Sequence, residues 1–120
     1  MTLPNEGSLL RIFIGESDRH AGMLLYEWIV RTARDHGLSG ATVLRGVEGF
    51  GARSRMRTAK ILELSTDLPI IVEIVDSTEH IDAFLPVIDG AIIDGLATVE
   101  KVQIRFYRSR SEPSPSNKLS

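Results

Sequence analysis

The residues best suited to ligand chemistry lie in one stretch of the sequence, from Ala41 to Lys60. Glycine allows the backbone to approach a ligand closely, and the planar guanidinium of arginine matches the geometry of a phosphate or carboxylate. These residue types therefore predict a loop that binds a small anion; from the residues alone, the alternative is a solvated surface loop. The stretch contains three glycines and then four basic residues: Gly46, Gly49, Gly51, Arg53, Arg55, Arg57 and Lys60.

A second polar group, Ser17, Asp18 and His20, has the residue types of a hydrolytic triad. Triads are assembled from segments distant in sequence, whereas such residues ahead of an apolar periodic segment commonly cap a helix. We therefore predict a helix start here. His20, His36 and His80 lack the spacing of metal ligands, and no pair of carboxylates stands out as a general acid and base. The sequence thus predicts no catalytic residues, no metal site and no cofactor.

Composition narrows the class of protein. A chain of 120 residues is long enough for one domain with its own core, and the absence of cysteine excludes disulfides and thiolate chemistry. With 14 basic and 16 acidic residues the net charge is −2, which argues against a nucleic-acid partner. The sequence lacks a secretory signal and an apolar run long enough to cross a bilayer, so we expect a cytoplasmic protein.

Apolar periodicity predicts the helices and strands that position the loop over 46–60, called the basic loop below. One helix is expected over 21–36, and a second begins at Asp76 with Glu79 completing a capping box. This second helix should bend or end near Pro86. Residues 1–7 are expected to form a flexible arm and 109–120 a disordered tail, which leaves a domain over 8–108. Alternation predicts strands over 8–15, 42–47, 70–75 and 97–107, with a short return strand at 61–64.

This β-α-β-β-α-β order predicts an α+β, ferredoxin-like fold with two helices on one face of a four-stranded antiparallel sheet. Its first and third strands are central neighbours, which places Arg11 beside Glu73 as an expected ion pair. The face without helices would be too apolar for water, so we expect a closed homo-oligomer built on it. Besides the ion pair, the two central strands place four apolar residues on this face: Leu9, Phe13, Ile71 and Val75.

Three motifs carry a resemblance to a known family: I-G-E-S-D-R at 14–19, A-T-V-L-R-G-V-E-G-F-G at 41–51 and D-L-P-I-I-V-E-I-V-D at 67–76. Together they resemble the PII signalling superfamily and, within it, the branch catalogued as domain of unknown function 190. The resemblance spans about Leu9 to Phe106. It implies a homotrimer with the three sheets packed inward, a mobile loop over Gly46 to Lys60 that meets a partner protein, and small effectors, commonly adenine nucleotides, in the clefts between subunits.

The resemblance also assigns residues to the ligand. Gly49, Phe50 and Gly51 match the base of the mobile loop, where backbone contacts to a ligand are expected. A second loop, which in PII proteins carries a glycine- and lysine-rich phosphate cradle, corresponds here to 90–96 and has no lysine. This favours an adenine nucleotide with fewer phosphates than ATP. The candidate ligand-binding residues are Gly46, Gly49, Phe50, Gly51, Arg53, Arg55, Arg57, Gly95 and Arg105, the last from a neighbouring subunit.

The leading hypothesis is therefore a non-enzymatic, PII-like regulatory protein whose effector orders or releases the basic loop. Because PII relatives commonly regulate transport, the resemblance implies a membrane transporter or channel as the partner. Two alternatives stay open. One is a hydrolase or transferase acting on a nucleotide or phosphoester, with Glu48 or Asp94 as the acting group and the basic loop as electrostatic stabiliser. The other is a divalent-ion response protein of similar trimeric architecture.

Overall fold

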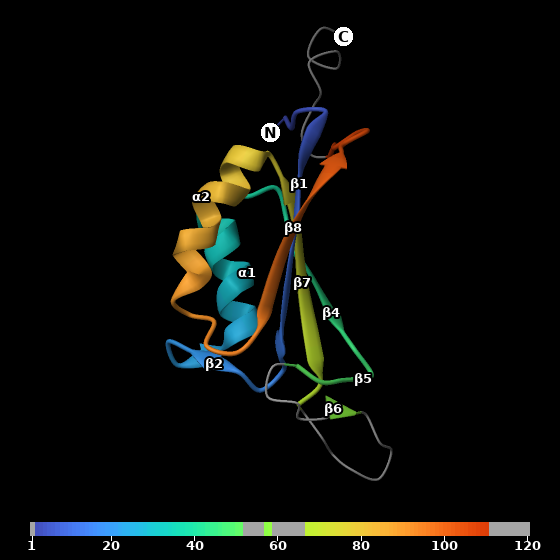
Figure 1. Cartoon of the computed structure of the whole chain (residues 1–120). Coiled ribbons are helices and arrows are strands. Elements are labelled where there is room, and N and C mark those ends of the chain that lie inside the picture. Colours follow the sequence, from blue (N-terminus) through green and yellow to red (C-terminus); the bar gives the residue numbers. More distant parts are fainter. Residues whose placement is uncertain (1, 52–56, 59–66, 111–120) are drawn as a thin grey trace, which may run out of the picture.

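A computed structural model describes residues 2–51, 57–58 and 67–110, with only the backbone described at 57 and 58 (Figure 1). The main sheet is antiparallel and has the strand order β4-β7-β1-β8. Helices α1 (Leu25–Asp35) and α2 (Thr78–Asp89) lie on the same side of this sheet and leave its other face open (Figure 1). The predicted α+β, ferredoxin-like fold is thereby confirmed. The four strands are β1 (Glu6–Gly15), β4 (Thr42–Arg45), β7 (Pro69–Asp76) and β8 (Leu96–Gln103).

The alternating pattern of the central strands decides which side chains enter the core. Every second residue of β1 and β7 is buried beneath the helices, whereas the residues between them reach the open face. Arg11 lies directly opposite Glu73, and its Nε donates a 2.8 Å hydrogen bond to Glu73 Oε2. The predicted ion pair is therefore confirmed. The core contains Leu10, Ile12, Val72 and Ile74 from the strands and Ile29, Ile81, Phe84 and Ile88 from the helices.

The first helix begins at Leu25 rather than Ala21, because a small hairpin precedes it. Strands β2 (Arg19–His20) and β3 (Met23–Leu24) pair across the two-residue turn Ala21-Gly22. Both turn residues have positive φ, 52° at Ala21 and 79° at Gly22, which is typical of the tight turns that match the twist of paired strands. The prediction placed the helix start too early because it assigned the polar residues ahead of this hairpin to a helix cap.

Ser17 and Asp18 fix the chain after β1 and do not cap the helix, so that part of the prediction is wrong. Ser17 Oγ donates a 2.6 Å hydrogen bond to Asp67 Oδ1, and Asp18 Oδ2 accepts a 2.9 Å bond from the backbone N–H of Gly15. The residue before α1 is Leu24, whose side chain makes no capping bond. Short polar side chains stabilise turns and helix starts by the same kind of bond, so their type alone does not distinguish the two.

The second helix starts at the expected place but with a different cap. Ser77 occupies the capping position, and its Oγ accepts a 3.1 Å hydrogen bond from the backbone N–H of His80. The helix continues through Pro86 to Asp89 instead of ending there. Pro86 is exposed, so water can satisfy a carbonyl that the missing N–H leaves without a donor. Neither helix in the described part of the chain has the length and apolar character needed to cross a bilayer.

Strand ends differ from the prediction by a few residues. Glu6 and Gly7 pair with Gln103 and Val102, so they belong to the sheet rather than to an arm. The last strand ends at Gln103 and not at Tyr107. After β4, the chain forms β5 (Glu48–Gly49), which pairs with β6 (Arg57–Thr58). The return strand predicted at 61–64 lies outside the described residues, and so do residues 111–120 of the tail predicted over 109–120.

Candidate ligand-binding pocket

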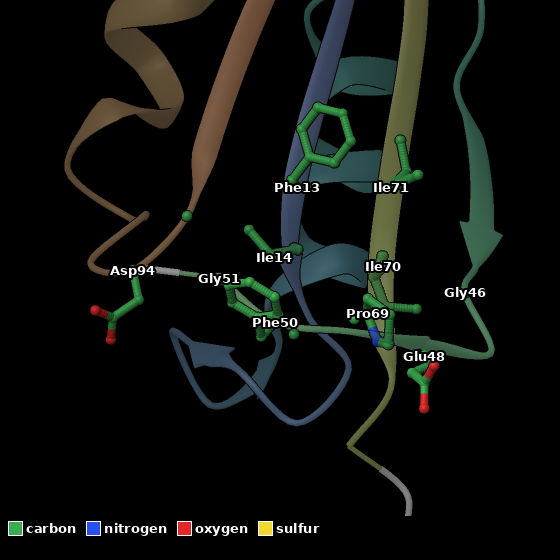
Figure 2. Close-up of a pocket in the computed structure, with 13 residues that line it drawn as sticks. Phe13, Ile14, Gly46, Glu48, Phe50, Gly51, Pro69, Ile70, Ile71 and Asp94 are labelled. Atoms are coloured by element: carbon green, nitrogen blue, oxygen red, sulfur yellow. The ribbon is translucent and has the colours of Figure 1, made fainter. Parts of the chain in front are cut away.

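A cavity of about 300 Å³ lies at the end of the sheet where the central strand β1 ends and the central strand β7 begins (Figure 2). The loop that follows β4 closes one side of it, and the turn before β8 closes another. Three segments that are far apart in the sequence therefore meet here. Of the predicted ligand-binding residues, the pocket brings together Gly46, Gly49, Phe50, Gly51 and Gly95.

Backbone pairing positions the walls. Gly15, the last residue of β1, pairs with Pro69, the first residue of β7, so the two central strands end level with one another. The backbone N–H of Gly46 donates a 2.7 Å hydrogen bond to the carbonyl of Pro69, which holds the start of the loop against β7. The entrance to the loop is therefore tied to the sheet by main-chain bonds.

Two of the pocket glycines are required by packing. A Cβ at Gly46 would lie 2.7 Å from Pro69 Cγ, and a Cβ at Gly95 would lie 2.7 Å from the carbonyl oxygen of Phe13. By contrast, a Cβ at Gly51 would have no atom within 4 Å. The sequence pattern attributed all these glycines to close approach of a ligand. At Gly46 and Gly95 the structure adds a second reason, the close approach of one protein segment to another.

The pocket combines apolar walls with two carboxylates. Phe13 and Ile71 contribute side chains from the open face of the sheet, while Phe50, which is 69% exposed, extends across the opening below Ile14 (Figure 2). In this view Glu48 and Asp94 lie on opposite sides of Phe50. Among the residues that line the pocket and are described, none is a lysine or an arginine. The interior therefore suits a largely apolar group that carries a few hydrogen-bond donors better than it suits a phosphate.

The predicted cationic residues are placed differently. Arg53 and Arg55 lie outside the described residues, and only the backbone of Arg57 is described, in β6. Arg105 follows the end of β8, whereas the pocket lies at the start of that strand, so Arg105 is at the other end of the sheet (Figure 1). The fold of the single chain therefore does not bring Arg105 to the pocket.

Sequence reasoning missed an ion pair beside the pocket. Arg45 Nη2 contacts Glu16 Oε2, and Glu16 is only 8% exposed. The backbone N–H of Glu16 donates a 2.8 Å hydrogen bond to the carbonyl of Leu68. Each of these three residues adjoins a pocket residue in the sequence, so the ion pair braces the strand ends that form the walls. The only signal available in the sequence was an acidic residue directly after a strand.

The described residues bear differently on a catalytic triad, a metal cluster and a pair of catalytic carboxylates. His20 does not approach Ser17 as a base would; its ring packs edge-on against Trp28, with centroids 4.4 Å apart, and Ser17 is bonded to Asp67. In the ranges that the structure describes, no group of three or more histidines or acids is arranged to hold a metal ion. The two carboxylates considered for catalysis do share the pocket.

Solved structures show which class of protein has this fold. CPII, a nitrogen regulatory PII-like protein from Thiomonas intermedia K12 bound to ADP, AMP and bicarbonate, superposes with a TM-score of 0.61 at 16% identity, covering 82% of this chain and 94% of that one. A protein from Thermus thermophilus, described as PII-like and signaling, superposes with a TM-score of 0.54 at 20% identity, covering 84% and 93%. The chain therefore has the PII-like fold.

Sequence comparison identifies the family within this class. The chain belongs to the DUF190 family, described as Uncharacterized ACR, whose model matches residues 7–104. It is 40% identical over 98 residues to a UPF0166 protein of Aquifex aeolicus (strain VF5), covering 82% of this chain and 92% of the relative. A UPF0166 protein of Methanocaldococcus jannaschii is 38% identical over 81 residues, covering 68% and 74%. The resemblance stated from the motifs is thereby confirmed.

Proposed function

We propose that this chain is a cytoplasmic, non-enzymatic PII-like regulatory protein that binds an adenine nucleotide in the pocket at the ends of β1 and β7. The observation that carries the proposal is the convergence of Phe50 and Gly95, from distant parts of the sequence, on one mostly apolar cavity. CPII, a protein of the same fold, was solved with ADP and AMP, which supports the choice of ligand.

The chemistry of the pocket suggests how the nucleotide is oriented. The exposed ring of Phe50 offers a stacking face for the base, and the carboxylates of Glu48 and Asp94 can accept hydrogen bonds from ribose hydroxyls or the exocyclic amine. The same carboxylates repel phosphate. The phosphate therefore points out of the cavity toward the arginines of the basic loop, which supply the counter-charge.

The regulatory output follows from this orientation. A nucleotide that contacts the loop in only one of its states shifts the loop toward that state, and the loop in turn determines binding of a partner protein. We propose a membrane transporter or channel as that partner. We also propose a homotrimer in which the pocket is completed by a neighbouring subunit that contributes Arg105.

Phe50→Ala tests the pocket. Isothermal titration with adenosine and AMP should show both ligands weakened about tenfold, because base stacking on an aromatic residue contributes about 1–3 kcal/mol. The matched control is Phe50→Tyr, which keeps an aromatic ring at this 69% exposed position and should bind both ligands as tightly as the wild type. Equal affinities in the wild type and Phe50→Ala would contradict the proposed pocket.

The basic loop is tested in the same experiment by replacing Arg53, Arg55 and Arg57 together with glutamine. In the wild type AMP should bind more tightly than adenosine, because only AMP carries a phosphate. In the triple variant this difference should disappear while adenosine binds as before. If AMP keeps its advantage, the counter-charge comes from elsewhere, and the proposed role of the loop in sensing the phosphate is wrong.

One observation favours a second candidate, the hydrolase or transferase considered above. Glu48 and Asp94 both line the pocket, where they could act on a bound phosphoester. Release of phosphate or base from ADP that is abolished by Glu48→Gln or Asp94→Asn would favour this candidate. Binding without turnover supports the regulatory proposal.

A further inference from the structure

Two histidines that are far apart in the sequence lie near one another at the end of the helical layer opposite the nucleotide pocket. His36 directly follows α1, and His80 lies in the first turn of α2. The end of α1 and the start of α2 are side by side (Figure 1). Both histidines line one small cavity of about 90 Å³, together with Leu38, Ala83 and Phe84.

The hydrogen bonds of the two rings leave the same nitrogen available on each. His36 Nδ1 lies 2.9 Å from the backbone carbonyl of Thr32, and His80 Nδ1 lies 2.8 Å from Asp76 Oδ1. A backbone carbonyl and a carboxylate only accept hydrogen bonds, so Nδ1 carries the proton in both rings. In a neutral imidazole with this tautomer, Nε2 presents a lone pair.

Both rings are held by groups that do not move easily. Asp76 is completely buried, and its carboxylate also accepts hydrogen bonds from the backbone N–H groups of Ser77, at 2.7 Å, and Ser39, at 2.8 Å. The His36 ring packs edge-on against Phe84, with centroids 5.9 Å apart. The His80 side chain is 58% exposed, so its free nitrogen can be reached from solvent.

We propose that His36 and His80 bind one divalent transition-metal ion through their Nε2 atoms, with water completing the coordination. An imidazole whose other nitrogen donates to a carboxylate or a carbonyl is the usual arrangement of a metal-binding histidine. Imidazole ligands favour ions such as Zn²⁺ over Mg²⁺, which prefers oxygen. The described part of the chain holds no group of three or more potential ligands, so this site has two protein ligands and binds more weakly than a closed structural zinc site.

Titration of the full chain with ZnCl₂ tests this proposal, and MgCl₂ is the negative control. The chain is prepared without a polyhistidine tag. We expect one Zn²⁺ per chain and no binding of Mg²⁺. His36→Gln and His80→Gln should each weaken Zn²⁺ binding by at least about tenfold, the smallest loss typical even for a residue that only supports a ligand. Because both residues serve one ion, the double variant should lose little more than either single variant.

His20→Gln is the matched control, because His20 is the remaining histidine of the sequence and packs on Trp28 in the β2–β3 hairpin. The proposal is overturned if Zn²⁺ does not bind, if His20→Gln weakens binding as much as the other variants, or if only one of the two proposed ligands matters. Adenosine and AMP binding should be unchanged in all three variants, so this test and that of the nucleotide pocket fail independently.

Nitrogen-15 NMR of the histidine side chains keeps the proposal testable if a variant does not fold. In the wild-type chain, Zn²⁺ should shift the Nε2 resonances of two histidines and leave their Nδ1 atoms protonated. A metal-induced change at Nδ1, or a change confined to His20, would contradict the proposed geometry.

Discussion

At the scale of single residues, Gly95 illustrates how a glycine can serve the protein and the ligand together. It lies in the turn before β8, beside the end of β1. The carbonyl oxygen of Phe13 and the side chains of Ile14 and Ile92 occupy the space that a Cβ would need. The wall of the pocket can approach β1 only because this residue has no side chain.

Gly95→Ala should lower the free energy of unfolding by about 1–3 kcal/mol, the usual cost of forcing an extra methyl group into a packed site. Urea denaturation measures this effect. Gly51→Ala is the control from the same pocket, because a Cβ there meets nothing within 4 Å, and its change should stay within about 0.5 kcal/mol. Equal effects in the two variants would show that packing at Gly95 is not the constraint.

At the scale of elements, Asp76 joins three segments of the chain. It is the last residue of β7 and precedes the cap of α2, and it bonds to Ser39 in the segment that follows α1. A buried carboxylate is stable here because its oxygens accept bonds from Ser39, Ser77 and His80. Asp76 therefore links the end of β7, the start of α2 and the segment after α1.

Asp76→Asn should destabilise the fold by about 1–3 kcal/mol. One carboxylate oxygen becomes an NH₂ group, which cannot accept a hydrogen bond, so a buried N–H group loses its acceptor. Thermal and urea unfolding give the size of the loss. Asp82→Asn makes the same change at an exposed position of α2, where we expect almost none. If both variants were equally stable, the Asp76 bonds would not contribute to the folded state.

At the scale of the whole molecule, the open face of the sheet has charged residues at its centre and apolar residues around them. Arg11 bonds to Glu73 at 2.8 Å and to Glu100 at 2.9 Å. The hydrogen bond to Glu73 is the largest cause that raises the pKa of Arg11, although burial acts in the opposite direction. The guanidinium therefore stays charged at physiological pH. Around these charges lie exposed leucines on both edge strands, Leu44 at 44% and Leu96 at 57%.

We expect this face to be covered by two further copies of the chain. Light scattering should then give three times the chain mass of 13.3 kDa. Leu44→Glu should reduce the mass toward that of one chain, because a charge would be buried without a partner. Val99→Glu is the control: Val99 is 45% exposed, but it pairs with Leu10 on the helical side of the sheet. A monomer in the wild type, or equal dissociation by both variants, would contradict the trimer.

Much of the architecture could be predicted from the sequence because it depends on local periodicity. Alternation assigns the faces of β1 and β7, and the β-α-β-β-α-β order makes these strands neighbours, which was enough to predict the pair of Arg11 and Glu73. Four of the pocket glycines and Phe50 were named from the sequence as candidate ligand-binding residues, because they match family motifs; that they bind a ligand stays a prediction. The four glycines are Gly46, Gly49, Gly51 and Gly95.

Other features were decided only by the tertiary structure. The hairpin before α1 was missed because Ser17 and Asp18 suit a turn as well as a helix cap. Asp18 accepts a local bond from Gly15, whereas the partner of Ser17, Asp67, is distant in the sequence and comes close only in the folded chain. The sequence predicted that Phe13 and Ile71 lie on the open face of the sheet, and only the folded structure shows that they also line the pocket. His36 and His80 line one cavity only because the end of α1 lies beside the start of α2. Spacing along a chain records local geometry, whereas a site built from several elements exists only after the core has brought them together.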